Sequence, residues 1–159
     1  MKYIVKFIAT VGFIGFIPFA SGTFGSLVGV AIWVVLSSWK FYPLLVLLMI
    51  AIGIIASDYA EKKIFHRDDP SEVVIDEVAG MLVSYMFFKF TFDNKSLLIL
   101  ILGFAIFRFF DILKPQPIKV IQKLPGGIGI MIDDIVSGIY TCLILSFIGY
   151  LFKIKMIFF

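Results

Sequence analysis

Charged side chains are scarce in this sequence. Only 16% of its 159 residues are charged, 61% are hydrophobic, and the mean hydropathy is +1.07. A soluble domain has roughly 45–50% apolar and about 25% charged residues. The composition therefore excludes an ordinary soluble domain and predicts an integral membrane protein, whose helices face lipid and one another.

Cysteine and histidine are nearly absent, with one residue of each, Cys142 and His66. One cysteine excludes an internal disulfide, and its position inside a hydrophobic stretch without basic neighbours argues against a thiolate nucleophile. One histidine excludes any site that needs two, and the nucleophile elbow of a Ser-His-Asp hydrolase is missing. The net charge of +3 suits a chain lying against anionic lipid and does not indicate a nucleic-acid partner.

Long hydrophobic stretches dominate the rest of the chain. They cover residues 24–39, 42–57, 73–90, 96–110 and 135–152. Several are shorter than the roughly 20 residues that span a hydrocarbon core, so some must borrow flanking residues or thin the bilayer. Residues 1–19 carry two lysines on an apolar background, which indicates a helix lying at the membrane interface. We expect an all-α membrane helical bundle of about five spans, forming one domain over residues 1–159.

The loops predict the orientation. If all five spans cross, the N-terminus and residues 58–72 and 111–134 lie on one side, which the positive-inside rule makes cytoplasmic. That side holds nine basic residues: Lys2, Lys6, Lys62, Lys63, Arg67, Arg108, Lys114, Lys119 and Lys123. It also holds every acidic residue except Asp93. Because acidic residues contribute little to topology, their clustering needs another cause.

Five of these carboxylates are expected at similar depth: Asp76 and Glu77 just inside the third span, Asp111 at the end of the fourth, and Asp133 and Asp134 at the start of the fifth. Such groups would repel one another or take up protons unless a cation held them. Hard oxygen ligands favour Mg²⁺ or Mn²⁺. The alternative is that acids in a first helical turn are there for the helix dipole or as caps, which does not account for Asp111.

Basic residues accompany the acids in FRFFDILKPQP, residues 107–117. Arg108 and Lys114 each lie three residues from Asp111, and one helical turn is expected to bring Arg108 and Asp111 together. Arginine can bind a phosphate with two hydrogen bonds, and lysine can neutralise the charge of the phosphate. The alternative is an arginine that snorkels beside Asp111 and a lysine that only marks the cytoplasmic side.

Three further groups of residues are weaker candidates. Thr23 and Ser26 belong to a small, glycine-rich stretch before a hydrophobic helix, where free N–H groups could face a phosphate, or where they could simply cap the helix. Asp58 and Glu61 share a helix face and are candidate outer metal ligands, or else solvated surface charges. His66 is a candidate general acid, or else an exposed loop histidine.

Four stretches together resemble the phosphatidylglycerophosphatase A family of bacterial membrane enzymes. They are SGTFGSL (21–27), HRDDPSEVVIDEVAGM (66–81), FRFFDILKPQPI (107–118) and GGIGIMIDDIVSGIY (126–140). The resemblance implies Mg²⁺-dependent hydrolysis of the terminal phosphomonoester of phosphatidylglycerophosphate at the inner membrane. The family often has His-Asp-Pro or His-Asp-x-Gly where this chain has His-Arg-Asp-Asp-Pro (66–70), an apparent insertion of one residue. This difference leaves the roles of His66, Asp68 and Asp69 open.

The residue pattern and the resemblance predict one mechanism. Asp76, Glu77, Asp133 and Asp134 hold one or two Mg²⁺ ions, and Asp111 either joins them or orients a water molecule. Arg108 and Lys114, together with Thr23 and Ser26, stabilise the phosphate charge. The expected partner is a membrane phospholipid substrate, with no nucleic acid and no protein partner indicated. A small divalent-cation or proton transporter, and a lipid-binding scaffold without activity, are the alternatives.

Overall fold

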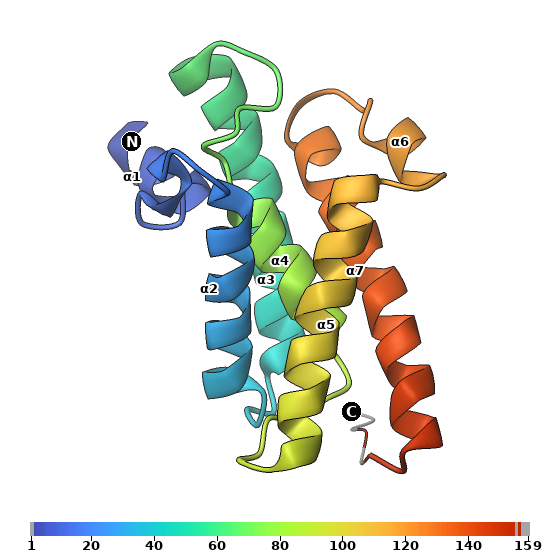
Figure 1. The fold of residues 1–159 in the computed structure, drawn as a ribbon. Coiled ribbons are helices and arrows are strands. Elements are labelled where there is room, and N and C mark those ends of the chain that lie inside the picture. The colour runs from blue at the N-terminus through green and yellow to red at the C-terminus, as the bar shows by residue number, and fades with distance from the viewer. Residues whose placement is uncertain (1, 155, 157–159) are drawn as a thin grey trace.

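The chain folds into helices joined by loops (Figure 1). A computed structural model describes residues 2–154 and 156, and no strand occurs among them. The elements are α1 (Lys2–Ala9), η1 (Ile14–Phe16), α2 (Ser21–Leu36), α3 (Tyr42–Tyr59), η2 (Ala60–Phe65), α4 (Ile75–Ser84), α5 (Asn94–Leu113), α6 (Ile118–Ile121) and α7 (Gly126–Leu151). The predicted fold class, an all-α membrane helical bundle, is confirmed.

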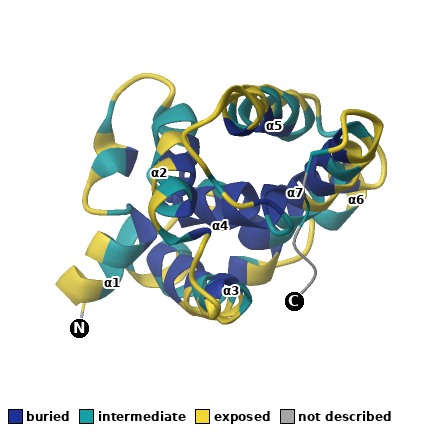
Figure 2. Cartoon of the chain, turned by 90° about the horizontal axis from the view of Figure 1, so that it is seen from below, coloured by how far each residue is buried: buried dark blue, intermediate teal, exposed yellow. Residues whose placement is uncertain are grey.

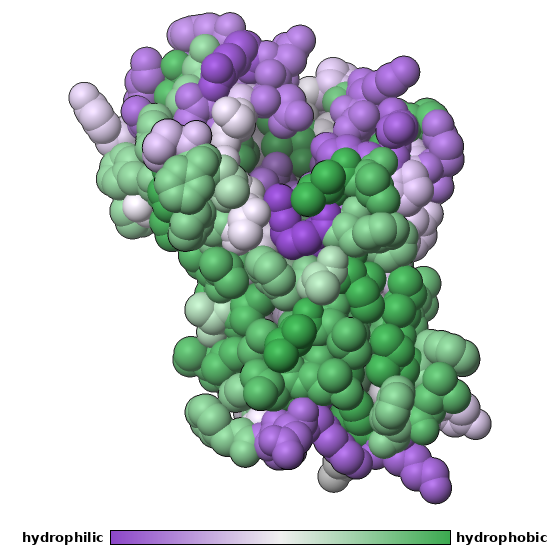
Figure 3. Space-filling model, viewed as in Figure 1, coloured by the Kyte–Doolittle hydropathy of each residue, from purple (hydrophilic) through white to green (hydrophobic). Residues whose placement is uncertain are grey.

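An apolar belt surrounds the middle of the molecule. Figure 3 shows a broad hydrophobic band between two hydrophilic ends. Among the described residues, three helices are long and apolar enough to cross a membrane: Tyr42–Phe65, Asn94–Leu113 and Gly126–Leu151. The apolar side chains that point outward include Val35, 75% exposed, and Ile55, 71% exposed. Because water would penalise so much exposed apolar surface, this belt fits contact with lipid.

The stretch 73–90 is not one continuous helix, so this predicted span is wrong in its length. Helix α4 ends at Ser84, and residues 85–93 form turns and irregular backbone and no helix. Backbone groups without helical partners are costly in a membrane unless protein atoms satisfy them. Here Trp33 Nε1 donates to the Phe88 carbonyl at 2.9 Å, and the Phe90 N–H donates to Ser37 Oγ at 2.9 Å.

Helix α4 lies at the centre of the bundle, where Figure 2 shows it among α2, α3, α5 and α7. Every residue of α4 is buried except the half-buried Glu77. Helices α4 and α7 cross in close contact: a Cβ added at Gly80 would lie 2.5 Å from the Asp134 carbonyl oxygen, and one at Gly138 would lie 2.3 Å from the Gly80 carbonyl oxygen. Glycine allows backbones in membranes to approach in this way. The crossing fixes the distance between the carboxylates at the start of α4 and those on α7.

Helix α7 begins at Gly126, nine residues before the predicted start of the fifth span. Its first residue has φ +69°, a conformation that glycine adopts without strain, and the Gly127 N–H donates to Asp58 Oδ1 at 3.3 Å. Asp58 of α3 therefore caps α7 from a neighbouring helix. As a consequence, Asp133 and Asp134 lie two turns inside α7 and not at its start.

The two ends of the bundle separate the loops as predicted. In Figure 1 the N-terminal segment, the loop of residues 66–74 and α6 lie at one end, and the end of α7 and the chain before α5 lie at the other. In residues 1–19 the helix is shorter than expected, since α1 ends at Ala9 and a turn leads to η1. Tyr3 and Phe7 are 86% and 53% exposed. An interfacial position for α1 remains a prediction.

Candidate functional site

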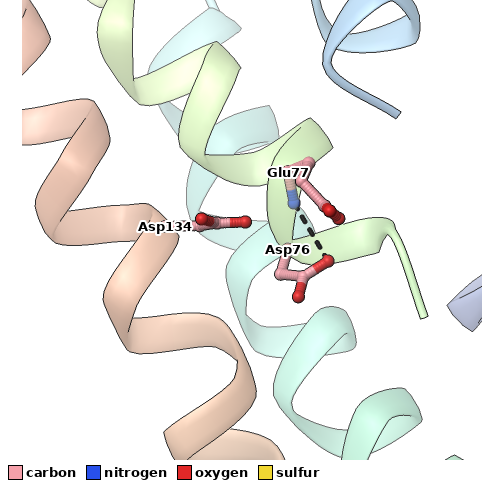
Figure 4. Close-up of side chains that lie close together, drawn as sticks. All are labelled: Asp76, Glu77 and Asp134. Atoms are coloured by element: carbon pink, nitrogen blue, oxygen red, sulfur yellow. Dashed lines mark hydrogen bonds between the residues drawn. The ribbon is translucent and has the colours of Figure 1, made fainter. Parts of the chain in front are cut away.

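Three acidic side chains from two helices meet at the hydrophilic end of α4. Asp76 and Glu77 are the second and third residues of α4, and Asp134 comes from α7. Each offers one carboxylate oxygen that lies within 4.8 Å of those of the other two. Figure 4 shows Asp134 pointing from α7 toward the start of α4. Asp76 is 8% exposed and Asp134 is 3% exposed, so both carboxylates are largely removed from water.

These carboxylates have few partners of their own. Asp76 Oδ1 accepts a 3.0 Å hydrogen bond from the Glu77 N–H, while Glu77 Oε2 is buried without a hydrogen-bond partner. An unpartnered buried carboxylate oxygen is costly, and three neighbouring carboxylates repel one another. A divalent cation removes both costs, since Mg²⁺ and Mn²⁺ prefer oxygen ligands. The donor set therefore fits such an ion.

Asp111 lies beside this group but has a cation of its own. Its Oδ2 is 2.6 Å from Arg108 Nη1, so the predicted contact between these two residues of α5 is present. Arg108 Nη1 also donates to Ser26 Oγ of α2 at 3.3 Å. The Asp111 carboxylate acts electrostatically on Asp134, which places it next to the three acids. Arg108 thus links α2 and α5 at the edge of the acidic group.

Asp133 has a basic partner as well. Lys114 Nζ is 2.5 Å from Asp133 Oδ2, which joins the end of α5 to α7. Burial lowers the pKa of Lys114, but the hydrogen bond to Asp133 and the charges of the neighbouring carboxylates outweigh burial, and the pKa lies above its usual value. Lys114 is therefore charged at neutral pH. The five predicted carboxylates are divided: three face one another, and two are paired with Arg108 and Lys114.

A polar pocket of about 190 Å³ contains this arrangement. All five predicted carboxylates line it together with Lys114. The lining residues are Ser21, Asp69, Pro70, Ser71, Val73, Asp76, Glu77, Asp111, Lys114, Asp133 and Asp134. Ser21 is the first residue of the glycine-rich stretch SGTFGSL (21–27), which was predicted to face a phosphate. Asp69 is one of the two acids whose role the sequence leaves open.

The glycine-rich stretch is helical, so the prediction that it lies before the helix is wrong. Helix α2 begins at Ser21 and includes Thr23 and Ser26 in its first two turns. The Ser26 hydroxyl donates to the Gly22 carbonyl at 2.9 Å and reaches the site only through Arg108. Thr23 does not line the pocket. The N-terminus of α2 still faces the acids, because Ser21 lines the pocket.

The remaining candidates lie outside the acidic group. Asp58 pairs with Lys62 at 2.6 Å and caps α7. Glu61 and His66 line a larger pocket of about 710 Å³, which shares Asp69 and Asp133 with the smaller one. Because Asp133 and Asp134 lie inside α7, a first-turn preference does not explain them, while Asp76 and Glu77 do occupy a first turn.

Comparisons with known proteins identify a family and several relatives. The sequence model of the family described as phosphatidylglycerophosphatase A matches residues 7–149. The chain is 37% identical over 139 residues to a phosphatidylglycerophosphatase A of Escherichia coli, covering 86% of this chain and 78% of that protein. It is 34% identical over 140 residues to a phosphatidylglycerophosphatase A of Haemophilus influenzae, covering 86% and 83%.

A third relative carries another name. It is a putative phosphatidylinositol-3-phosphatase of Bacteroides thetaiotaomicron, 34% identical over 140 residues, covering 83% of this chain and 85% of that protein. No solved structure matches the chain. The family match covers most of the chain and includes every residue of the acidic pocket. This chain belongs to the phosphatidylglycerophosphatase A family.

Proposed function

We propose that this protein hydrolyses the terminal phosphomonoester of phosphatidylglycerophosphate at the cytoplasmic face of a bacterial inner membrane. In this reaction a water oxygen bonds to phosphorus, the bond from phosphorus to the glycerol oxygen breaks, and that oxygen takes a proton. The products are phosphatidylglycerol and inorganic phosphate. The observation that carries the proposal is the group of Asp76, Glu77 and Asp134, of which the first and last are buried, beside two cationic side chains.

Asp76, Glu77 and Asp134 would hold Mg²⁺ or Mn²⁺, because they face one another and take part in none of the salt bridges among the described residues. When bound, the ion supplies Lewis-acid polarisation of the phosphoryl group and activation of water. Of the two roles predicted for Asp111, orienting the water fits better than binding the ion, because its carboxylate already accepts from Arg108. The same reasoning makes Asp133 a partner of Lys114 and a less direct ligand than predicted.

Arg108 and Lys114 would stabilise the negative charge that develops on the phosphate and on the departing glycerol oxygen. Both lie at the edge of the acidic group, and their side chains are 18% and 26% exposed, so they can reach a ligand while remaining paired. Ser26 holds Arg108 in place. Ser21 at the N-terminus of α2 adds a positive helix end at the same pocket.

The depth of the site suits a lipid substrate. Figure 3 shows the hydrophilic end meeting the apolar belt, with hydrophilic atoms reaching down to the upper edge of the belt. A phospholipid headgroup lies at this level of a bilayer. The lipid can therefore place its phosphate among these residues while its acyl chains stay in the membrane.

The test is an assay of the purified protein in detergent with phosphatidylglycerophosphate and Mg²⁺. Phosphate release that stops with a chelator and returns with Mg²⁺ is expected. Because one relative is named for phosphatidylinositol 3-phosphate, that lipid and a water-soluble phosphomonoester serve as competing substrates. A preference for the soluble ester would contradict a lipid substrate.

A cation or proton transporter is the rival function, since acidic residues within membranes also mark ion paths. The acids gather at one end of the bundle, and Asp93 is the single acidic residue expected at the other. Ion flux in liposomes without phosphate release from lipid would favour the transporter. Metal-dependent turnover would exclude both the transporter and an inactive scaffold.

A further inference from the structure

Gly22, in the first turn of α2, lies directly against the carboxylate of Glu77. A Cβ added there would lie 2.2 Å from Glu77 Oε1 and 3.3 Å from Arg108 Nη1. Real Cβ atoms do not approach other atoms as closely as 2.2 Å, so the carboxylate of Glu77 occupies space that any side chain at this position would need. The first turn of α2 therefore contacts the Glu77 carboxylate at Gly22.

Two other glycines of α2 also lie against α4 or the residue before it, but they meet different atoms. A Cβ at Gly25 would lie 3.0 Å from Val74 Cβ, and one at Gly29 would lie 2.6 Å from Met81 Cβ. Those atoms belong to or adjoin the backbone and move only if the helices separate. In contrast, Glu77 Oε1 is the end of a flexible side chain, which can rotate away at little cost. A methyl group at position 22 would therefore move the carboxylate and leave the helix packing intact.

Besides α2, the Asp76 side chain and the charge of Arg108 act on the Glu77 carboxylate. Its Oε2 is buried and has no hydrogen-bond partner, and Arg108 is engaged with Asp111 and Ser26. Asp76 uses one oxygen to accept from the Glu77 backbone N–H, so it is tied to the helix start. Of the three acids, Glu77 has the longest side chain and thus the most freedom to turn. Contact with α2 is therefore one of the interactions that set its direction.

We propose that Gly22 is a positioning residue, which keeps the Glu77 carboxylate turned toward Asp76 and Asp134 by leaving it the space beside α2. This inference rests on the proposed metal site. In the protein with Gly22→Ala, the carboxylate is displaced from the other two, and the affinity for a divalent cation falls. Residues that orient metal ligands typically change metal affinity by roughly 10–100-fold.

The experiment measures binding of Mn²⁺ to purified protein by electron paramagnetic resonance, which needs no turnover. Gly22→Ala is expected to weaken Mn²⁺ binding by roughly tenfold or more and to leave the melting temperature without metal unchanged. Activity should return toward the wild-type kcat at high Mg²⁺, because every ligand is still present. Gly29→Ala is the matched control: the same change on the same helix should lower the melting temperature and leave Mn²⁺ binding unchanged.

A second variant separates displacement of Glu77 from other effects. Glu77→Asp shortens the side chain by one methylene, so in the double variant with Gly22→Ala the new methyl group has room. The two changes together should weaken Mn²⁺ binding less than the product of their single effects. If Gly22→Ala fails to fold, the double variant should fold, and its failure would overturn the inference.

The outcomes distinguish this inference from the proposed function. Wild-type affinity for Mn²⁺ in Gly22→Ala would overturn the role of Gly22 alone. Absence of Mn²⁺ binding in the wild-type protein would instead overturn the metal site on which the role depends. Strictly multiplicative effects of Gly22→Ala and Glu77→Asp would show that position 22 acts on something other than Glu77.

Discussion

At the scale of single residues, the acids of this site differ mainly in what faces them. Asp111 and Asp133 each contact a basic side chain, at 2.6 and 2.5 Å. Asp76, Glu77 and Asp134 face one another. Ion pairs satisfy the first two without any ligand, whereas the other three gain most from a cation. Substitutions in the two sets should therefore have opposite effects on stability.

Replacing Asp134 with Asn should abolish phosphate release and leave the protein folded. The amide has nearly the same shape but removes one of three mutually repelling charges, so without metal the variant should melt at or above the wild-type temperature. Stabilisation by added Mg²⁺ should be lost, because binding to the folded state is what provides it. Phosphate release and thermal unfolding with and without Mg²⁺ measure this. Full activity in the variant would refute the role of Asp134.

Replacing Lys114 with Gln should destabilise the protein. It leaves the buried Asp133 carboxylate without its cation, which typically costs about 3 kcal/mol. Since the pKa of Lys114 is raised, the wild-type stabilisation is present below the ordinary lysine value of about 10.4 and disappears as pH rises through the folded-state pKa. Chemical unfolding at several pH values tests both statements. Lys119→Gln, at an exposed position on α6, is the control and should change little.

At the scale of elements, α4 differs from a helix that spans the whole membrane. It is short and buried, and the following residues 85–93 cross the rest of the bundle with irregular backbone. Side chains of α2 and α3 take the place of helical hydrogen bonds; for example, Tyr42 Oη donates to the Leu82 carbonyl at 2.8 Å. The short helix lets its N-terminal acids lie at the depth of the site while its other end stays in the core.

Replacing Trp33 with Phe should weaken this irregular segment. The change removes the donor to the Phe88 carbonyl and leaves that oxygen buried without its partner, at a cost of about 1–3 kcal/mol. Activity per folded molecule should be retained, because Trp33 lies toward the other end of α2 from the site. Trp39→Phe is the matched control, since Trp39 is 49% exposed. Equal melting temperatures of the two variants would contradict the role of this hydrogen bond.

At the scale of the whole molecule, the charges are distributed unequally between the two hydrophilic ends. The end with the acidic pocket also carries the loop of residues 66–74 and α6, as Figure 1 shows. This arrangement makes the bundle asymmetric across a membrane. If the positive-inside rule holds for this chain, the pocket faces the cytoplasm.

Cysteine labelling tests the orientation. Cys142 is buried and is the single natural cysteine, so it gives little background. Arg67→Cys and Lys119→Cys at the pocket end should react with a membrane-impermeant maleimide only when the inner face is accessible. Lys95→Cys, near the start of α5, should react in cells whose outer membrane alone is permeable. The reverse pattern would place the pocket outside the cytoplasm.

Some of these features follow from the sequence because they are local or compositional. Long apolar stretches fix a helical membrane bundle, since only helices and closed barrels satisfy the backbone in lipid. The contact between Arg108 and Asp111 follows from their spacing on one helix. The gathering of acids at one end also follows from the order of stretches and loops.

Only the tertiary structure decided which acids face one another and which are paired with bases. That division depends on the close crossing of α4 and α7 at Gly80 and Gly138, and on the position of Lys114 beside α7. The start of α7 and the early end of α4 likewise depend on partners from other helices, namely Asp58 and Trp33. Local periodicity contains no information on such distances, because they arise between residues far apart in the chain.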